Sequence, residues 1–211
     1  MWAGRGPTLI VGWVAGAVAQ PDEYSLVHHT VSDAGAETAN SAWLANQVGD
    51  NLTGVLLVVF AIGLGRSVGR HASARIGSIL LAIVGVGLSL AGAFRIDCRA
   101  IDAGCDKPWD SSHGTAHGIA AGIATLAFVL APFVLARALK LTPLWRRLWV
   151  PTLAFGFGTI AALLVGGAFG QGLSDLLSAA VWLAWIAVLA FRMVLLARDV
   201  TDIPAREVRA T

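Results

Sequence analysis

The sequence has little charge, and several signatures of soluble proteins are missing from it. Only 13% of its 211 residues are charged, whereas a soluble domain carries roughly 25%. The basic residues form no run and no stripe interleaved with aromatic residues, which argues against a nucleic-acid partner. Nothing resembles a phosphate-binding loop or a nucleophile elbow. The composition therefore excludes an ordinary soluble domain, and we expect membrane lipids as partners and no nucleic acid.

Long apolar runs recur along the whole chain instead. Hydrophobic residues make up 56% of the sequence, and a spanning helix needs about 20 apolar residues in a row. The runs lack the period-two alternation of a membrane barrel strand. The predicted spans cover residues 3–20, 43–65, 76–96, 113–139, 149–170 and 173–197. We therefore predict an all-α polytopic membrane bundle of six transmembrane helices within residues 1–198, followed by a polar cytoplasmic tail, 199–211.

The distribution of Lys and Arg predicts the orientation. Twelve basic residues flank the ends that would share one side with both termini, and only Arg95, Arg99 and Lys107 lie on the other side. Because basic residues are retained in the cytoplasm, we expect both termini inside. Richness in Ala, Gly, Val and Arg is typical of a GC-rich bacterial genome. The predicted location is the bacterial cytoplasmic (inner) membrane, with multiple passes.

The first span has a second interpretation. The apolar stretch between Arg5 and the small residues 17–19 resembles a cleavable signal peptide. We prefer an uncleaved helix, because cleavage would leave an odd number of spans, and Pro7 is a favourable helix start.

The sequence contains two cysteines, Cys98 and Cys105. Both lie in the connection between the third and fourth spans, which the basic residues place outside. An oxidising compartment permits a disulfide there. We predict a Cys98–Cys105 disulfide, with two free thiols as the alternative.

Polar side chains within the spans gather near the predicted outer ends. Asn46, Asp50 and Thr53 recur at helical spacing on the second span. A carboxylate inside a membrane needs a partner or a proton. Arg95, near the outer end of the third span, is the predicted counter-ion of Asp50, with Asp97 two residues beyond it.

Four of the five histidines fall on the predicted outer side. His113 and His117 share one helix face at i and i+4, so they could bind zinc together and activate water for hydrolysis. A further ligand could come from His29, His28, Asp50 or Asp97. Haem ligation by paired histidines is a weaker alternative. The histidines could instead form a structural hydrogen-bond network or bind a ligand without a metal, and we prefer this interpretation.

Several short motifs resemble a known family. They are Val31-Ser32-Asp33-Ala34-Gly35-Ala36, then Trp43 and Asn46, then Phe94-Arg95-Ile96-Asp97-Cys98, and then His113-Gly-Thr-Ala-His117. Together they resemble the bacterial six-helix membrane family catalogued as domain of unknown function nine-nine-eight. The resemblance implies a membrane location and a shared outer polar site, centred on Ser32, Asp33, Asp97, His113 and His117. It implies no particular reaction.

A fainter resemblance is to the membrane hydrolase superfamily of alkaline ceramidases and adiponectin receptors. Ser25-x-x-x-His29 and His113-x-x-x-His117 are similar to its motif spacing. Membership would imply a zinc site formed by three histidines.

The sequence thus predicts an outward-facing polar pocket that binds a lipid headgroup or a small polar ligand. A zinc-dependent membrane hydrolase acting on a lipid or lipid-linked substrate is the alternative. The predicted ligand-binding residues are Ser32, Asp33, Asn46, Asp50, Arg95 and Asp97. The catalytic candidates are Asp50, Asp97 and Ser32, and the metal candidates are His113, His117 and His29.

Overall fold

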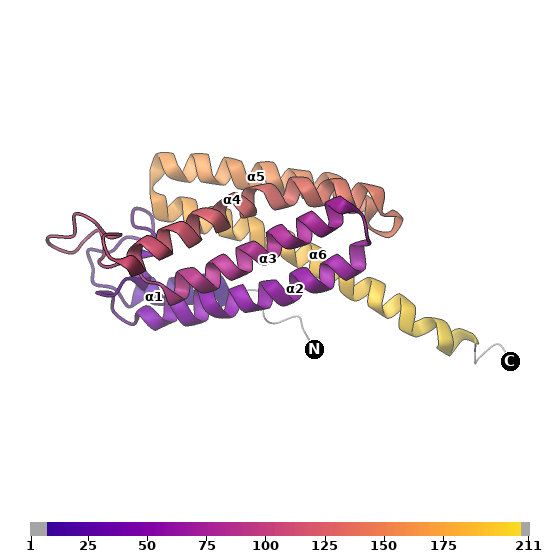
Figure 1. Cartoon of the computed structure of the whole chain (residues 1–211), viewed down its shortest axis with the longest axis horizontal. Helices are drawn as coiled ribbons and strands as arrows, with labels where there is room; N and C mark the ends of the chain where they lie inside the picture. Colours follow the sequence, from indigo (N-terminus) through magenta and orange to yellow (C-terminus); the bar gives the residue numbers. More distant parts are fainter. Residues whose placement is uncertain (1–7, 208–211) are drawn as a thin grey trace.

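The computed structural model describes residues 8–207 and is a bundle of long helices with loops gathered at one end (Figure 1). The α-helices are α1 (Thr8–Val18), α2 (Leu52–Val68), α3 (Ala72–Ala93), α4 (Ser112–Leu141), α5 (Trp149–Phe169) and α6 (Gln171–Glu207). Three shorter elements are the 3-10 helices η1 (Asp33–Gly35) and η3 (Pro143–Leu148) and the π-helix η2 (Leu44–Asn51), which runs directly into α2. The described residues contain no strand.

Five of the described helices are long and apolar enough to cross a membrane. They are Leu44–Val68, Ala72–Ala93, Ser112–Leu141, Pro143–Phe169 and Gln171–Arg198. The predicted second to sixth spans are therefore confirmed. With 11 residues, α1 extends only about 16 Å, roughly half of the hydrocarbon core. Positions 3–7 of the predicted first span and 208–211 of the predicted tail lie outside the described residues, and the α6 backbone stays helical to Glu207.

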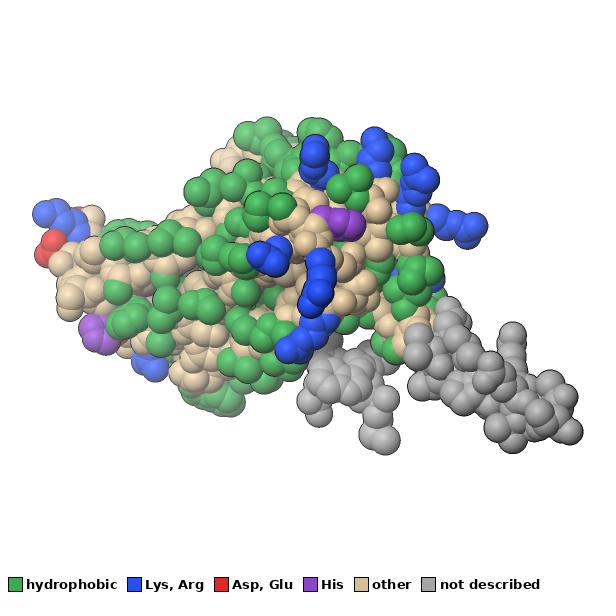
Figure 2. Space-filling model, turned by 45° about the vertical axis from the view of Figure 1, so that its right-hand side comes forward, with side chains coloured by type: hydrophobic (Ala, Val, Ile, Leu, Met, Phe, Trp, Pro, Cys, Tyr) green, Lys and Arg blue, Asp and Glu red, His purple; other side chains and the backbone are tan. Residues whose placement is uncertain are grey.

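Large apolar side chains cover the outside of the bundle. Leu126, Leu164 and Phe169 are each more than 60% exposed. In water such a surface would drive association, whereas in a bilayer it is the surface that contacts lipid. Figure 2 shows hydrophobic side chains on the flanks and Lys and Arg side chains gathered over one end.

The two ends of the bundle differ in chemistry. We call one the arginine end. It comprises the α2–α3 connection, the nearby arginines Arg66, Arg70 and Arg75, and the α4–α5 connection 142–148. The other is the disulfide end, defined by the loops 19–43 and 94–111. In Figure 1 the arginine end is on the right and the disulfide end on the left. The sequence predicts that the disulfide end faces outward.

The interior holds two hydrophobic clusters. The larger joins α2, α3, α4 and α6 around fully buried side chains such as Leu64, Leu135 and Trp185. The smaller lies around α1 and joins Leu9 and Trp13 to Ala179 of α6. Because lipid tails are as apolar as these side chains, the two clusters hold the helices together by close van der Waals packing.

The loops of the disulfide end are tied together by specific contacts. Cys98 and Cys105 form a disulfide with their Cα atoms 5.9 Å apart, as predicted. The Glu37 N–H donates to the Ile96 carbonyl at 3.0 Å. Arg99 donates to Gln20 at 2.9 Å and forms an ion pair with Asp102 at 2.7 Å. The loop 19–43 is therefore held against the loop 94–111.

The Arg99–Asp102 pair predicts an acid-dependent contribution to stability. Its hydrogen bonds to the Arg99 side chain lower the pKa of Asp102 from 3.8 to about 2. A carboxyl whose pKa falls on folding stabilises the fold above its unfolded-state pKa and loses this contribution as the pH falls toward the folded-state value. Asp102→Asn should therefore lower the free energy of unfolding by about 1 kcal/mol at neutral pH, since water screens the pair.

This cost should disappear between about pH 4 and pH 2. The measurement is the unfolding midpoint of both proteins across that range. The control is Asp106→Asn, because Asp106 is exposed and its side chain makes no hydrogen bond to a described residue. A cost for Asp102→Asn that persists unchanged at pH 2 would contradict the ion-pair explanation.

Candidate functional site

A cavity of about 190 Å³ lies inside the bundle toward the disulfide end. Its walls include Leu9 and Trp13 of one hydrophobic cluster and Val84 and Trp182 of the other. The cavity therefore lies between the two clusters. The polar groups that line it include Ser32, Asp50, His117, Asp175 and Ser178. None of the described residues that line it is Lys or Arg.

The π-helix η2 and α1 together place Asp50 at the cavity. The Trp13 indole N–H donates to Asp50 Oδ1 at 2.8 Å. The α1 backbone lies directly against η2, since a Cβ added at Gly12 would lie 2.3 Å from the Gly49 nitrogen. No larger residue fits at position 12 without moving α1. π-helices are rare and frequently occur at functional sites, and this one carries the carboxylate of the second span.

The second turn of α6 supplies the second carboxylate, Asp175. Asp175 Oδ2 accepts from the Val31 N–H at 3.2 Å, and the Leu173 N–H donates to the Val27 carbonyl at 3.0 Å. The loop 19–43 is thus attached to the start of α6. Asp175 was not among the predicted site residues. A usable signal was present: Asp175, Ser178 and Trp182 recur at i, i+3 and i+7 and so share one face of the last helix.

His117 of α4 is buried and hydrogen-bonded through both ring nitrogens. Its Nδ1 lies 2.9 Å from the Ala91 carbonyl oxygen and 2.8 Å from that of Phe94. Two carbonyl acceptors require a proton on Nδ1. The Nε2 atom lies 3.1 Å from the Ser32 hydroxyl and forms a hydrogen bond with it. His117 therefore joins the end of α3 to the loop 19–43 and forms part of the cavity wall.

Asp33 and Asn46, two predicted ligand-binding residues, do not line the cavity. Asp33 accepts from the Thr30 N–H at 2.9 Å, from the Thr30 hydroxyl at 2.8 Å and from the Ala100 N–H at 2.8 Å. The Asn46 amide donates to the Gly35 carbonyl at 2.8 Å. Both side chains hydrogen-bond to the backbone of the loops, so they stabilise the loops next to the cavity and do not contact a ligand inside it.

Asp97 and Arg95 also lie outside the cavity. Asp97 accepts from the N–H and the hydroxyl of Ser111, the N-cap of α4. These hydrogen bonds lower the pKa of Asp97 below its ordinary value. Arg95 makes no hydrogen bond or ion pair with any described residue, and the side-chain donor to Asp50 is Trp13. The predicted Asp50–Arg95 ion pair is therefore absent, although the end of α3 packs against η2, where a Cβ at Gly92 would lie 3.0 Å from the Asp50 Cβ.

The three predicted zinc ligands are dispersed. His113 is exposed, with its ring edge against Phe94 at a centroid distance of 5.4 Å. His29 Nδ1 accepts from the Ser25 N–H at 2.8 Å, and His117 is engaged as above. Among residues 8–198, no group of three or more His, Cys, Asp or Glu side chains could hold a metal ion.

Two further groups characterise the polarity of the site. The ring of Trp182 lines the cavity, and its buried indole N–H has no hydrogen-bond partner within the described part of the chain. Nearby, burial raises the pKa of Tyr24 far above 10, and the negative charges of Asp33 and Asp175 raise it further. The site therefore combines negative potential with one unused donor.

Spanning helices that enclose a polar cavity define the class: a multi-pass helical membrane protein. The chain belongs to the family described as "Protein of unknown function (DUF998)", whose model matches residues 6–192. This match confirms the family resemblance stated from the motifs. No curated protein and no solved structure matches the chain. The resemblance to alkaline ceramidases and adiponectin receptors gains no support from these comparisons.

Proposed function

We propose that the cavity between the two hydrophobic clusters binds a small cationic group, either the amine of a lipid headgroup or a free small polar amine. One observation carries the proposal: Asp50 and Asp175 line the same cavity, and none of the described residues that line it is Lys or Arg. The excess of basic residues at the arginine end supports entry of the ligand from the extracytoplasmic side.

The electrostatics of a membrane interior favour a cation here. A carboxylate removed from water requires an opposite charge or a proton. The donor to Asp50 is the neutral indole of Trp13, and the donors to Asp175 are the Val31 N–H and the neutral Gln171 side chain. None of these donors neutralises the charge. A bound ammonium group would compensate the pair of acids and donate hydrogen bonds to their oxygens.

The lining of the cavity also suits an ammonium ligand. The rings of Trp13, Phe128 and Trp182 line it, and aromatic faces attract organic cations. The indole N–H of Trp182 requires an acceptor, which a hydroxyl or ester oxygen beside the ammonium would provide. The ligand chemistry that fits is therefore an amino alcohol or the equivalent part of a lipid.

The volume sets the size of the ligand. A cavity of about 190 Å³ corresponds to roughly six water molecules at about 30 Å³ each. This is smaller than the roughly 300–1,000 Å³ of sites for drug-sized molecules. Ethanolamine and choline fit these limits, whereas a lipid would insert only its amine-bearing end.

Titration of ethanolamine and choline onto the detergent-purified protein tests the proposal, with isothermal calorimetry as the measurement. We expect saturable binding that Asp50→Asn and Asp175→Asn each weaken at least about thirtyfold, because each leaves the ligand's charge partly unpaired. Asp106→Asn removes the same charge from the exposed loop and should leave binding unchanged. Equal binding by all four proteins, or no binding of either amine, would refute the proposal.

The zinc-dependent hydrolase has less support from the geometry. His117 has no free ring nitrogen, because Nδ1 faces two carbonyls and Nε2 faces Ser32. A metal would have to displace Ser32 and recruit His113 and His29 from separate positions. Elemental analysis that finds one zinc per chain, lost in His117→Ala, would favour the hydrolase over amine binding.

A further inference from the structure

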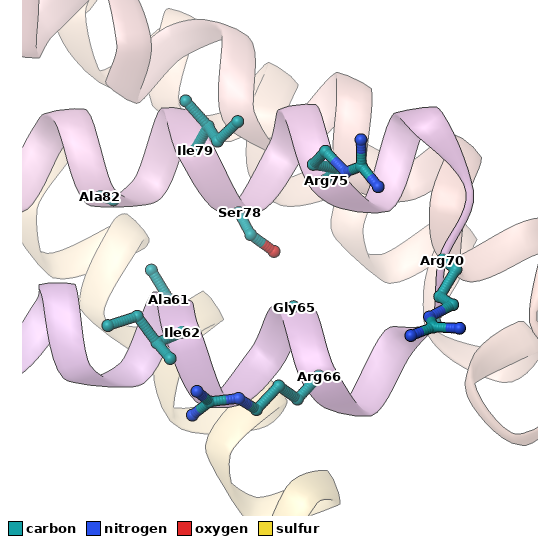
Figure 3. A pocket seen from close by; sticks show the side chains of 10 residues that line it. Ala61, Ile62, Gly65, Arg66, Arg70, Arg75, Ser78, Ile79 and Ala82 are labelled. Carbon is teal, nitrogen blue, oxygen red and sulfur yellow. The ribbon is translucent and has the colours of Figure 1, made fainter.

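A second cavity, of about 330 Å³, lies between α2 and α3 at the arginine end (Figure 3). We call it the arginine cleft. Arg66 of α2, Arg70 of the connecting turn and Arg75 of α3 line its polar part. The apolar lining, which includes Ile62 and Ile79, extends from there toward the middle of the bundle. The arginine cleft thus has a cationic end and a hydrocarbon-like end.

The charges of the arginine cleft are not neutralised by the protein. Within residues 8–198, the side chains of Arg66, Arg70 and Arg75 make no hydrogen bond or ion pair, and the lining contains no acidic residue. All three are exposed. Three guanidinium groups around one cleft form a site for an anion with several oxygens, since each can bind such a group through two parallel hydrogen bonds.

A buried hydroxyl supplies a fourth polar group. The Ser78 Oγ atom is buried and has no hydrogen-bond partner among the described residues. Figure 3 shows this hydroxyl pointing from α3 into the gap toward α2, where Gly65 faces it. A Cβ at Gly65 would lie 3.0 Å from Ser78 Oγ. The glycine leaves space beside the hydroxyl and offers it no side-chain acceptor, so a ligand oxygen is the missing partner.

We propose that the arginine cleft binds one anionic phospholipid from the membrane leaflet at the arginine end. The phosphate contacts Arg70 and Arg75, the Ser78 hydroxyl donates to a headgroup or ester oxygen, and an acyl chain lies along Ile62 and Ile79. Basic sites between spanning helices on the cytoplasmic side are suited to anionic headgroups, and the sequence places the arginine end on that side.

The two-part lining favours a lipid over a free anion. Ala82 lies seven residues beyond Arg75 on α3, about 10 Å along the helix, so the apolar part of the arginine cleft reaches hydrocarbon depth. Inorganic phosphate would satisfy the arginines and leave this part uncovered. A phospholipid satisfies both parts because its phosphate and its acyl chains are joined in the same order along the membrane normal.

Native mass spectrometry of the full chain, titrated with phosphatidylglycerol and separately with phosphatidylcholine, tests the proposal. We expect one phosphatidylglycerol per chain, with at least tenfold weaker binding in Arg70→Gln/Arg75→Gln, since each basic residue near an anionic headgroup contributes about a factor of five. The matched control is Arg146→Gln/Arg147→Gln. It removes the same charge from the same end, outside the arginine cleft, and should bind within about twofold of the wild type.

Ser78→Ala separates lipid binding from a structural role. The hydroxyl has no protein partner, so its removal should leave the unfolding temperature of the lipid-free protein unchanged. Binding of phosphatidylglycerol should weaken about threefold through the lost hydrogen bond. Three results would overturn the proposal: equal loss of binding in both arginine double variants, equal affinity for phosphatidylcholine, or displacement of the lipid by inorganic phosphate.

Discussion

Replacing His117 with alanine is expected to lower the free energy of unfolding by about 3 kcal/mol. The ring is 4% exposed and hydrogen-bonds to the carbonyls of Ala91 and Phe94 and to the Ser32 hydroxyl. Alanine removes all of these partners and leaves a space in the cavity wall. The loop 19–43 would then lose its contact with α4, so amine binding should weaken together with stability.

His113→Ala is the matched control for His117→Ala. His113 lies one turn earlier on the same face of α4, is exposed, and contacts the ring of Phe94. We expect a cost below about 1 kcal/mol. Unfolding of the purified proteins in mixed micelles with increasing dodecyl sulfate measures both values. Equal costs for the two variants would instead indicate that the two histidines act as a unit, as a shared metal would require.

Gly166→Ala should also cost about 3 kcal/mol, because no side chain fits between α5 and α6 at this point. A Cβ at position 166 would lie 2.1 Å from the Cα atom of Ser174 and 2.4 Å from its nitrogen. Backbone atoms cannot move away by a change of rotamer, so the helices must separate. Asp175 follows Ser174 directly, and the separation should displace its carboxylate and weaken amine binding.

Gly167→Ala is the matched control, because Gly167 directly follows Gly166 on α5. A Cβ at Gly167 would meet nothing within 4 Å, and alanine is a better helix former than glycine by about 1 kcal/mol. Gly167→Ala should therefore leave stability unchanged or raise it slightly, with amine binding intact. The same unfolding assay compares the two variants. A similar cost at both positions would show that α5 is sensitive to any added methyl group, and the close-approach explanation would fail.

The two candidate sites place different demands on the same bundle. The cavity toward the disulfide end is acidic and aromatic, whereas the arginine cleft at the opposite end is basic and partly apolar. A cationic group therefore suits the cavity toward the disulfide end, and an anionic headgroup suits the arginine cleft. Since the variants that test them lie on different elements, failure of one proposal leaves the other intact.

The positions of the long helices followed from the sequence because hydrophobic length is a local property. Each run of about 20 apolar residues must be helical in a bilayer, whatever it packs against. The disulfide was predictable for a similar reason, since both cysteines lie seven residues apart in one loop. The polar character of Asp50, His117 and Ser32 was also visible, because polar groups inside spans are exceptional.

Which polar groups meet was decided only by the tertiary structure. Partners such as Trp13 and Asp50, or Val31 and Asp175, lie far apart in the chain, and helical spacing says nothing about which helices become neighbours. Close backbone contact at Gly12 and Gly49 brought α1, instead of Arg95, to Asp50. The sequence alone determined a membrane bundle with polar and basic ends. Packing determined the cavity, because a cavity is what remains between helices once their contacts are set.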